Sequence, residues 1–517
     1  MPEPGHYYVT TPIYYVNAAP HLGHAYTSIV TDVMARHMRQ RGEEVFFLTG
    51  TDEHGEPVAQ EAEREGVTPQ ELADRNAERF RALMPLLDVS NDFFIRTTDP
   101  QHHERVREIL QRVYDAGFVY EGLYEGWYCP RCADFKTEGE MLEGHRCPIH
   151  EIELTRESEQ NYFFALSRFQ EPLERLYAER PDWVLPRERA NEARSFIEGG
   201  LQDVSLTRPS LNWGVRVPWD EQQVFYVWFD ALLNYVTALS YARPGEDLTD
   251  RFWPASLQII GKDILKFHTV YWPALLLAAG LALPQRIFVH GFLLGGDGRK
   301  MSKSLGNVLD PFAVIERYGT DALRFYLVRE VTLGADGSVS EETVDGRYHA
   351  ELANELGNLA SRTLAMVARY RESVVPAGPL DEALAGQLDT LAPRVCELLD
   401  AVAPTAALEQ IWLCVRRLNR YVEERAPWEQ AKDPANAAEL DSTLATLVEG
   451  LRIVATLLHP YLPASTRALL EALGEDGASA RAPRLDGARY GAGSGDGAGV
   501  LAGRSIGDLP PLFPRVR

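Results

Sequence analysis

Two histidines, His21 and His24, enclose a glycine, Gly23, where a strand-like segment passes into a helical one. Backbone N–H groups and the positive end of a helix dipole at such a junction bind anions. A glycine there lets the backbone approach a ligand closely. Two histidines at this spacing, taken alone, are more often surface residues near a helix N-cap than parts of a site. The chemistry that the cluster suggests is the binding of a phosphate.

A second cluster, Lys300-Met301-Ser302-Lys303-Ser304, follows a glycine-rich stretch. Lysines on such a loop can close over a triphosphate and stabilise charge on departing pyrophosphate. An isolated pair of lysines at this spacing is usually part of a solvated loop. Since both clusters fall in the same α/β region, one ligand could contact both. The pair is therefore far more specific than either cluster alone.

Three of the five cysteines form two short knuckles with a histidine, Cys129-Pro-Arg-Cys132 and Cys147-Pro-Ile-His150. Two knuckles at this separation suit one tetrahedral Zn²⁺. His145 is an alternative fourth ligand, and redox chemistry is an alternative use of the first cysteine pair. We prefer zinc with His150, because the second knuckle repeats the spacing of the first. Four protein ligands leave no open position, so the predicted role is structural.

The composition is that of a globular protein with several domains: 517 residues, 45% apolar and 25% charged. We find no signal peptide, and the longest apolar run, residues 274–283, has about half the length of a membrane span. We therefore expect a cytoplasmic protein with no membrane partner. The formal net charge of −23 counts against a nucleic-acid partner. Any RNA contact must use local basic patches.

Strand-like and helical segments alternate in two parts of the chain, which predicts an α/β fold with a parallel sheet. The expected segments are residues 7–11, 23–39 and 45–48, and then 224–229, 257–260 and 287–289. Their binding residues are expected at the carboxyl ends of the strands.

These patterns predict six regions along the chain. They are a Rossmann-like catalytic domain in two halves (1–116 and 223–294), an insertion with the zinc knuckle (117–222), the lysine loop and the region after it (295–345), an all-α helix bundle (346–473) and a C-terminal tail (474–517). Within the tail, the glycine-rich residues 474–503 are predicted to be flexible or loosely packed. The apolar residues 509–513 are predicted to dock onto the body.

The histidine and lysine clusters together resemble the two signature motifs of class I aminoacyl-tRNA synthetases. Further stretches resemble the methionyl-tRNA synthetase family in particular: residues 9–24, 49–55 (TGTDEHG), 226–235 (YVWFDALLNY), 260–268 (IGKDILKFH) and 288–293 (FVHGFL). The resemblance extends over about nine-tenths of the chain. Leu232 departs from the proline of some members, but a leucine there also occurs in the family.

The resemblance implies a ligase that activates L-methionine with ATP and Mg²⁺ to methionyl-adenylate. It then transfers the methionyl group to the 3′ end of elongator and initiator tRNA(Met), releasing AMP. His21, His24, Lys300 and Lys303 would be the catalytic residues, acting on the phosphates. Gly23, Gly261 and Asp263 would complete the ATP site, with Asp263 as an acceptor for a ribose hydroxyl.

The resemblance also implies a pocket for methionine lined by Ile13, Tyr15, Asp52, Trp228, Ala231, Tyr235 and His290. A flexible, polarizable thioether packs well against aromatic faces. Tyr15 or His290 could offer the sulfur a weak donor. Asp52 would take the substrate's ammonium in a charge-assisted hydrogen bond. Without the resemblance, these residues would be assigned to core packing or helix capping.

In the helix bundle, the resemblance assigns the CAU anticodon to Asn358, Arg362 and Trp428. Asn358 and Arg362 lie one helical turn apart, and aromatic stacking with edge hydrogen bonds is how proteins recognise unstacked bases. Arg416, Arg417 and Arg420 form a basic run that could meet the tRNA backbone. Since the chain ends without the appended dimerising domain of some members, we expect a monomer.

Three rival functions remain open at this point. A synthetase for another apolar amino acid would carry a larger editing insertion than the roughly hundred residues here. A small-molecule adenylating enzyme would have no use for the helix bundle. A catalytically inactive tRNA-binding protein would not need both phosphate motifs intact.

Overall fold

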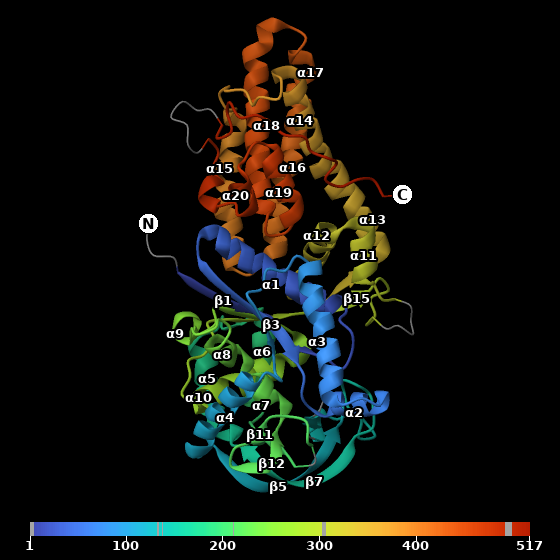
Figure 1. Ribbon diagram of the computed structural model, residues 1–517, viewed down its shortest axis with the longest axis vertical. Coiled ribbons are helices and arrows are strands. Elements are labelled where there is room, and N and C mark those ends of the chain that lie inside the picture. The colour runs from blue at the N-terminus through green and yellow to red at the C-terminus, as the bar shows by residue number, and fades with distance from the viewer. Residues whose placement is uncertain are drawn as a thin grey trace.

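The computed structural model describes residues 5–131, 134–136, 138–209, 211–301, 307–491 and 499–516. The molecule is elongated, with a helix bundle at one end (Figure 1). At the other end lie the part that the sequence predicts to be catalytic, called the catalytic part below, and its insertion. No helix among these residues is long and apolar enough to cross a membrane. The predicted fold class, a parallel α/β domain followed by an all-α domain, is confirmed.

The catalytic part is built on a parallel sheet in the order β2-β3-β1-β13-β14-β8, with β4 also paired to β3. The strands are β1 (His6–Thr10), β2 (Tyr14–Tyr15), β3 (Glu44–Asp52), β4 (Phe93–Arg96), β8 (Val184–Leu185), β13 (Leu257–Gly261) and β14 (Ile287–His290). The strand order reverses between β1 and β13. In sheets of this type, ligands bind in the crevice beyond the carboxyl ends of the strands at that reversal.

Helices cover both faces of this sheet, which explains why β3 and β13 are buried along nearly their whole length. The helices of the first half are α1 (Leu22–Arg41), α2 (Glu56–Glu65), α3 (Pro69–Leu86) and α4 (Pro100–Asp115), and α10 (Trp272–Ala278) follows β13. The apolar core around α1 continues without a break into the core of the helix bundle.

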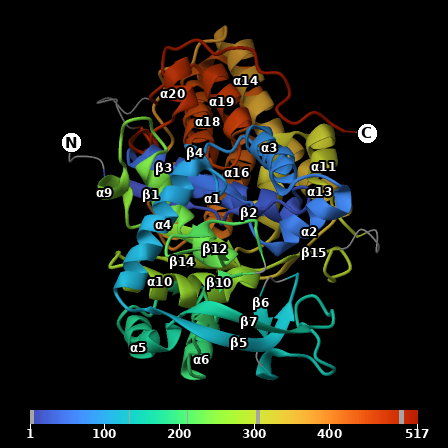
Figure 2. The ribbon, with the colours of Figure 1, turned by 60° about the horizontal axis from the view of Figure 1, so that its bottom comes forward.

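The insertion lies on the far side of the catalytic part from the bundle (Figure 2). Its antiparallel sheet has the order β6-β5-β7-β9, formed by β5 (Val119–Cys129), β6 (Asp134–Lys136), β7 (Thr155–Phe164) and β9 (Val204–Ser205), with α5 (Gln170–Glu179) and α6 (Arg187–Glu198) beside it. One part of the predicted insertion does not belong to it. β8 returns to the parallel sheet as the neighbour of β14, and two residues are too short to show a strand pattern.

The strand predicted over residues 224–229 is also wrong. β12 (Asp220–Phe225) ends earlier and pairs antiparallel with β10 (Thr207–Arg208) and β11 (Arg216–Val217) in a sheet of its own. Helix α7 (Val227–Ala231) follows, and then α8 (Asn234–Thr237). Residues 223–239 are all buried, and periodicity cannot distinguish a strand from a helix that is buried all round.

The link to the bundle begins with β15 (Leu293–Gly295), which pairs with β16 (Gly337–Val339). Helices α11 (Pro311–Tyr318), α12 (Thr320–Glu330) and α13 (Glu341–Arg347) and a π-helix, η7 (Tyr348–Gly357), lead upward from it. The bundle consists of α14 (Asn358–Arg371), α15 (Glu382–Asp400), α16 (Pro404–Arg425), α17 (Pro427–Gln430), α18 (Ala437–Leu458) and α19 (Pro463–Ala472).

The C-terminal tail packs on the bundle more closely than its composition predicts. It contains α20 (Gly477–Arg481), and Arg452 of α18 donates to the carbonyls of Gly487 and Arg489. The prediction of a loose segment is therefore wrong for its described residues. The predicted docking of residues 509–513 is confirmed, since Phe513 is buried beside Tyr348, whose hydroxyl donates to the carbonyl of Pro514.

Candidate active site

One cavity opens at the carboxyl ends of β1, β3, β13 and β14, where the strand order predicts a ligand. Its volume is about 230 Å³. All seven residues predicted to bind methionine line it, and so do His21, Gly23, His24, Gly261 and Asp263. The structure thus brings the residues predicted for the amino-acid pocket and most of those predicted for the ATP site into one space.

The apolar wall of the cavity is aromatic. Trp228, on α7, stacks on Phe267 with ring centroids 3.8 Å apart and an angle of 6° between the planes. Tyr15 meets Trp228 edge-on at 6.2 Å. The three rings are in contact with one another and form one continuous apolar surface.

Asp52 lies at the end of β3 with 2% of its surface exposed. Its Oδ1 atom has no hydrogen-bond partner among the described residues. Burial, and then the negative charge of Asp230, raises the pKa of Asp52 well above its usual range. A buried carboxyl in this position needs a cation, and an ammonium group would supply one.

The two groups predicted to donate to the thioether, on His290 and Tyr15, interact with other groups of the protein. Nδ1 of His290 donates to the carbonyl of Gly291 at 2.8 Å, and Nε2 lies 2.8 Å from the hydroxyl of Thr27. Burial lowers the pKa of His290, so its ring is neutral and Nε2 acts as an acceptor. The hydroxyl of Tyr15 lies close enough to Asp52 to favour the charged form of that carboxyl. In this structure, therefore, the cavity offers a thioether apolar and aromatic surface, and neither predicted donor points to it without another interaction.

His21 and His24 cap α1. Nδ1 of His21 accepts from the backbone N–H of Gly23 at 3.1 Å, and Nδ1 of His24 accepts from the N–H of His21 at 3.0 Å. Burial lowers the pKa of both rings, and that of His24 falls well below its ordinary value. A neutral ring whose Nδ1 is an acceptor carries its proton on Nε2. The caps thus prepare two N–H donors at an anion-binding helix end.

Of the two predicted lysines, the structure describes only Lys300. Lys300 is exposed and pairs with Leu294 in an isolated bridge, and it is not among the lining residues. Lys303 lies outside the described residues, as does the rest of the loop from 302 to 306. Asp263 is exposed in a 3₁₀ turn, η4 (Lys262–Ile264), directly after β13.

A separate group of side chains in the insertion can hold a metal ion. The ligand atoms of Cys129, Cys147 and His150 all lie within 4.8 Å of one another, and Nδ1 of His150 is 3.8 Å from each sulfur. Tetrahedral zinc with its usual bond lengths would need about 3.6 Å between such atoms. Cys132 lies outside the described residues. His145 is not part of this group, and its ring stacks on Trp127 at 4.1 Å.

Two of the predicted anticodon residues, Arg362 and Trp428, lie side by side, close to α17 at the free end of the bundle (Figure 1). The guanidinium of Arg362 is 5.8 Å from the ring centre of Trp428, and its Nη2 atom is 2.7 Å from Glu423. Asn358 is exposed at the start of α14. The basic run is less available than the sequence indicates, since Arg416 and Arg417 form ion pairs with bundle carboxylates.

Several lining residues were not predicted from the sequence. The hydroxyl of Thr27 is hydrogen-bonded to Nε2 of His290, and the hydroxyl of Tyr235 is hydrogen-bonded to Nε2 of His268 at 2.8 Å. Thr27 follows His24 by three positions on one helix, so helical spacing could have pointed to it. His268 lies in a π-helix, η5 (Phe267–Tyr271), and no local pattern predicts its direction.

Comparison with known proteins agrees with this geometry. A family model for "tRNA synthetases class I (M)" matches residues 7–157 and 136–364, and a model for the "Anticodon binding domain of methionyl tRNA ligase" matches residues 375–487. The fold and the site thus define a class I aminoacyl-tRNA synthetase.

Relatives that match along the whole chain give the particular family. A methionine–tRNA ligase of Streptomyces coelicolor is 43% identical over 99% of this chain and 96% of its own length, and one of Rhizobium meliloti is 43% identical over 100% and 99%. Mycobacterium tuberculosis methionyl-tRNA synthetase in complex with methionyl-adenylate aligns with a TM-score of 0.92 and 43% identity, over 99% of this chain and 100% of that one. Its free-state form gives 0.85. The chain belongs to the methionyl-tRNA synthetase family.

Proposed function

We propose that this chain is a methionine–tRNA ligase that forms methionyl-adenylate from L-methionine and ATP and transfers the methionyl group to tRNA(Met). The observation that carries the proposal is the single cavity, in which Asp52 and an aromatic wall share one space with His21, His24 and Asp263. The methionyl-tRNA synthetase family and the names of its relatives support the same activity.

Binding of methionine would begin with its ammonium group at Asp52. The side chain would then pack on Tyr15 and Trp228, with Ile13, Ala231, Tyr235 and His290 around it. This arrangement leaves the substrate carboxylate near the N-terminus of α1, where the phosphates of ATP belong. Reaction at the α-phosphorus then depends on holding the two substrates together.

Charge stabilisation would come from His21 and His24 through their Nε2 protons and from Lys300 and Lys303 on the loop. Mg²⁺ would arrive with ATP and neutralise phosphate charge. Gly23 and Gly261 leave room for the nucleotide. A Cβ on Gly261 would lie 2.5 Å from Asp263 and 3.6 Å from His290, so any side chain there would intrude on the cavity. Asp263 would accept from the ribose.

For the metal group, we propose a structural Zn²⁺ held by Cys129, Cys132, Cys147 and His150. The 3.8 Å separations and the full burial of Cys129 and Cys147 fit this ion. Bound there, zinc would fix the knuckle at the tip of β5. The tRNA partner would be read by Asn358, Arg362 and Trp428, and we propose that the chain acts as a monomer in the cytoplasm.

The test is amino-acid-dependent exchange between ATP and pyrophosphate, measured across the twenty standard amino acids and homocysteine. The expected result is exchange strongest with methionine, with homocysteine the nearest competitor, since apolar pockets separate one methylene by only about 1–3 kcal/mol. Strongest exchange with another amino acid would overturn the pocket. No exchange from folded, zinc-loaded protein would favour a catalytically inactive tRNA-binding protein instead.

A further inference from the structure

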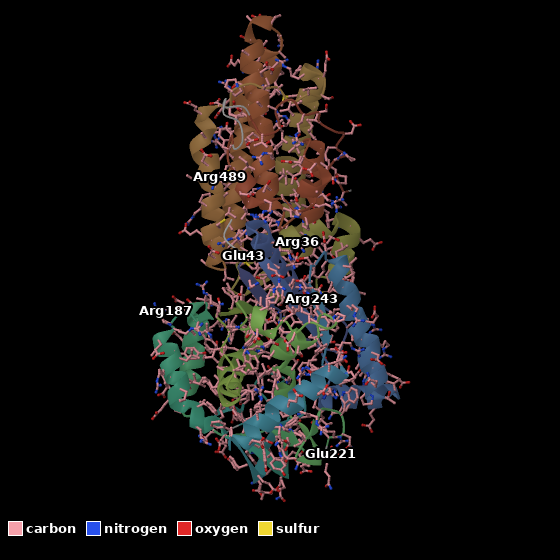
Figure 3. All side chains as sticks on the ribbon, turned by 60° about the vertical axis from the view of Figure 1, so that its left-hand side comes forward. Arg36, Glu43, Arg187, Glu221, Arg243 and Arg489 are labelled. Carbon is pink, nitrogen blue, oxygen red and sulfur yellow. The ribbon has the colours of Figure 1, made fainter. Side chains whose placement is uncertain are left out.

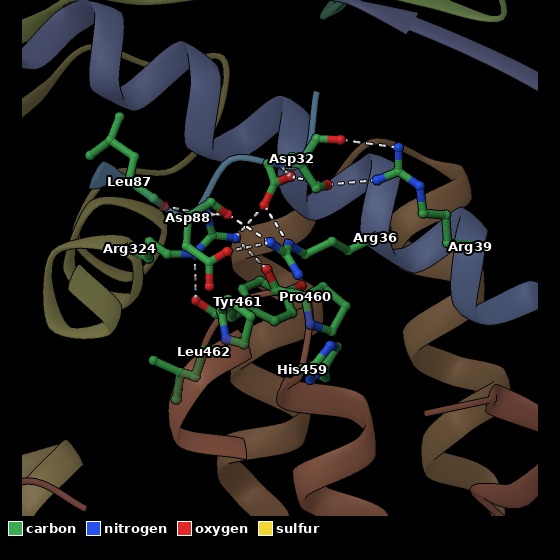
Figure 4. A network of polar contacts seen from close by, with 12 residues as sticks. Asp32, Arg36, Arg39, Leu87, Asp88, Arg324, His459, Pro460, Tyr461 and Leu462 are labelled. Carbon is green, nitrogen blue, oxygen red and sulfur yellow. Dashed lines mark hydrogen bonds and ion pairs between the residues drawn. The ribbon is translucent and has the colours of Figure 1, made fainter. Parts of the chain in front are cut away.

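A buried polar junction joins the catalytic part to the helix bundle (Figure 4). At its centre, Asp32 of α1 and Arg324 of α12 are both 0% exposed, and Oδ2 of Asp32 is 2.7 Å from Nη2 of Arg324. Arg36 lies beside them, at the level where α1 crosses below the bundle (Figure 3). Neither phosphate chemistry nor methionine binding uses these residues.

Arg324 uses all five N–H donors of its guanidinium group. Nη1 donates to the carbonyls of Leu87 (3.0 Å) and Asp88 (3.2 Å), Nη2 to Asp32 and to the carbonyl of Pro460 (2.7 Å), and Nε to the carbonyl of Tyr461 (3.2 Å). These acceptors belong to three separate parts of the chain: α1, the connection from α3 to β4, and the turn from α18 to α19. A lysine has three donors and no planar fork, so it could not replace this set.

Asp32 is equally saturated. Oδ2 also accepts from Arg36 at 2.7 Å, while Oδ1 accepts from the backbone N–H of Ser90 at 2.7 Å and from its hydroxyl. Burial opposes the charge, but Arg36 and Arg324 outweigh it and lower the pKa of Asp32 to about 2. A buried ion pair adds little net stability over apolar packing, but leaving one partner alone is costly. The geometry of this junction is therefore strongly fixed.

Two helices near the junction, α1 and α18, extend toward the two proposed sites, the cavity and the anticodon site. α1 runs from the junction to its caps, His21 and His24, in the cavity. α18 has 22 residues, a length of about 33 Å. Its first turn contacts the corner before Trp428, where Nη2 of Arg425 is 3.3 Å from Glu439. Near the junction, Gln40 of α1 donates to the carbonyl of Thr456 at 2.7 Å, which adds a second link.

We infer that Arg324, together with Asp32, is a positioning residue for tRNA charging. It fixes the angle between α1 and α18, so that one tRNA molecule can place its anticodon on the bundle and its 3′ end in the cavity. This inference rests on the proposed function. It concerns only the coupling between the cavity and the anticodon site, since each site is built from its own side chains.

The experiment compares Arg324→Lys with Arg452→Lys in the full chain. Arg452 is a matched control, because it is also buried and binds an acid (Glu449) and two carbonyls, but all its partners lie in the bundle and tail. Three quantities are measured: methionine-dependent ATP–pyrophosphate exchange without tRNA, affinity for an isolated CAU anticodon stem-loop, and the ratio of charging rates for tRNA(Met) with CAU and with a changed anticodon.

In Arg324→Lys, exchange and stem-loop affinity are expected to stay close to those of the unmodified protein, while the charging ratio falls about tenfold. Arg452→Lys is expected to keep the ratio. Gln40→Met, which removes a single bond, should lower the ratio less, and it decides the matter if Arg324→Lys does not fold. An unchanged ratio, an equal loss in Arg452→Lys, or exchange falling in step with charging would overturn the inference. Absence of exchange in the unmodified protein would refute the proposed function instead.

Discussion

Asp52 combines two properties that rarely occur together, full burial and an unfilled acceptor atom. If it receives the methionine ammonium, Asp52→Asn should raise KM for methionine by about 10- to 100-fold, because a hydrogen bond to a charged group is lost. KM for ATP should change little. Exchange kinetics at varied methionine measure both, and equal effects on the two substrates would place Asp52 outside the amino-acid site.

The same residue predicts a pH dependence. The pKa of Asp52 is raised in the free protein, because burial and Asp230 disfavour its charge. A bound ammonium would lower it again, so methionine affinity is full above the raised pKa and is lost as pH falls through it. KM for methionine should therefore rise on the acidic side in the unmodified protein and stay flat in Asp52→Asn. A slope shared by both proteins would have to come from another group.

Lys300 is predicted to act on rate and not on binding. It is exposed and lies outside the cavity that would hold methionine, so only a loop movement or a long phosphate group can bring it to the reaction. Lys300→Ala should lower the rate of adenylate formation by about 100-fold. Rapid-quench measurement at saturating methionine gives this rate. A loss of methionine affinity as large as the loss of rate would contradict the role.

Elements differ in how far their sequences predict them. Near the histidine cluster, the strand and the helix have different hydrophobic periods, and a turn separates them. β1 and α1 therefore begin within a residue of their predicted positions. The segment from β12 to α8 has no polar face, so its hydrophobic pattern shows no period from which strand or helix could be predicted. The strand expected there is in part a helix. The two residues of α7 that the family motif names, Trp228 and Ala231, nevertheless line the cavity, because a family motif does not depend on secondary structure. Their role in binding methionine stays a prediction. Thr27 and His268 are supporting contacts. Helical spacing from His24 could have pointed to Thr27, whereas only the folded chain brings His268 to the pocket.

The zinc knuckle is an element whose order should depend on its metal. Its apolar core is small: Cys129, Cys147 and Leu154 with a few half-buried neighbours. A structural zinc ion contributes folding free energy directly in such small units. Cys147→Ser should lose an equimolar zinc content, measured by elemental analysis, and hydrogen exchange should rise in residues 126–155. Unchanged protection in metal-free protein would show that the knuckle folds without the ion.

At the scale of the whole molecule, we expect that a substitution at the anticodon site impairs tRNA charging without impairing methionine activation in the cavity. Trp428 is 36% exposed at the far end of the bundle, with Arg362 over its ring, and it is not among the described residues that line the cavity. Stacking of one base on an aromatic ring contributes about 1–3 kcal/mol, so Trp428→Ala should lower kcat/KM for tRNA by about 10- to 100-fold. Methionine-dependent exchange without tRNA should remain intact.

The acidic charge of the chain bears on how the anticodon is recognised. The chain carries a formal charge of −23, and Arg416 and Arg417 are committed to carboxylates of the bundle. These ion pairs weaken the hold that Arg416 and Arg417 could have on a phosphate backbone, so we expect recognition to depend on the bases themselves. Trp428→Ala should consequently remove most of the preference for CAU, while Arg420→Ala, at an exposed arginine of the same bundle, should weaken charging of all anticodons alike. Parallel charging assays with CAU and a changed anticodon distinguish the two, and a preference that survives Trp428→Ala would move anticodon recognition to another face.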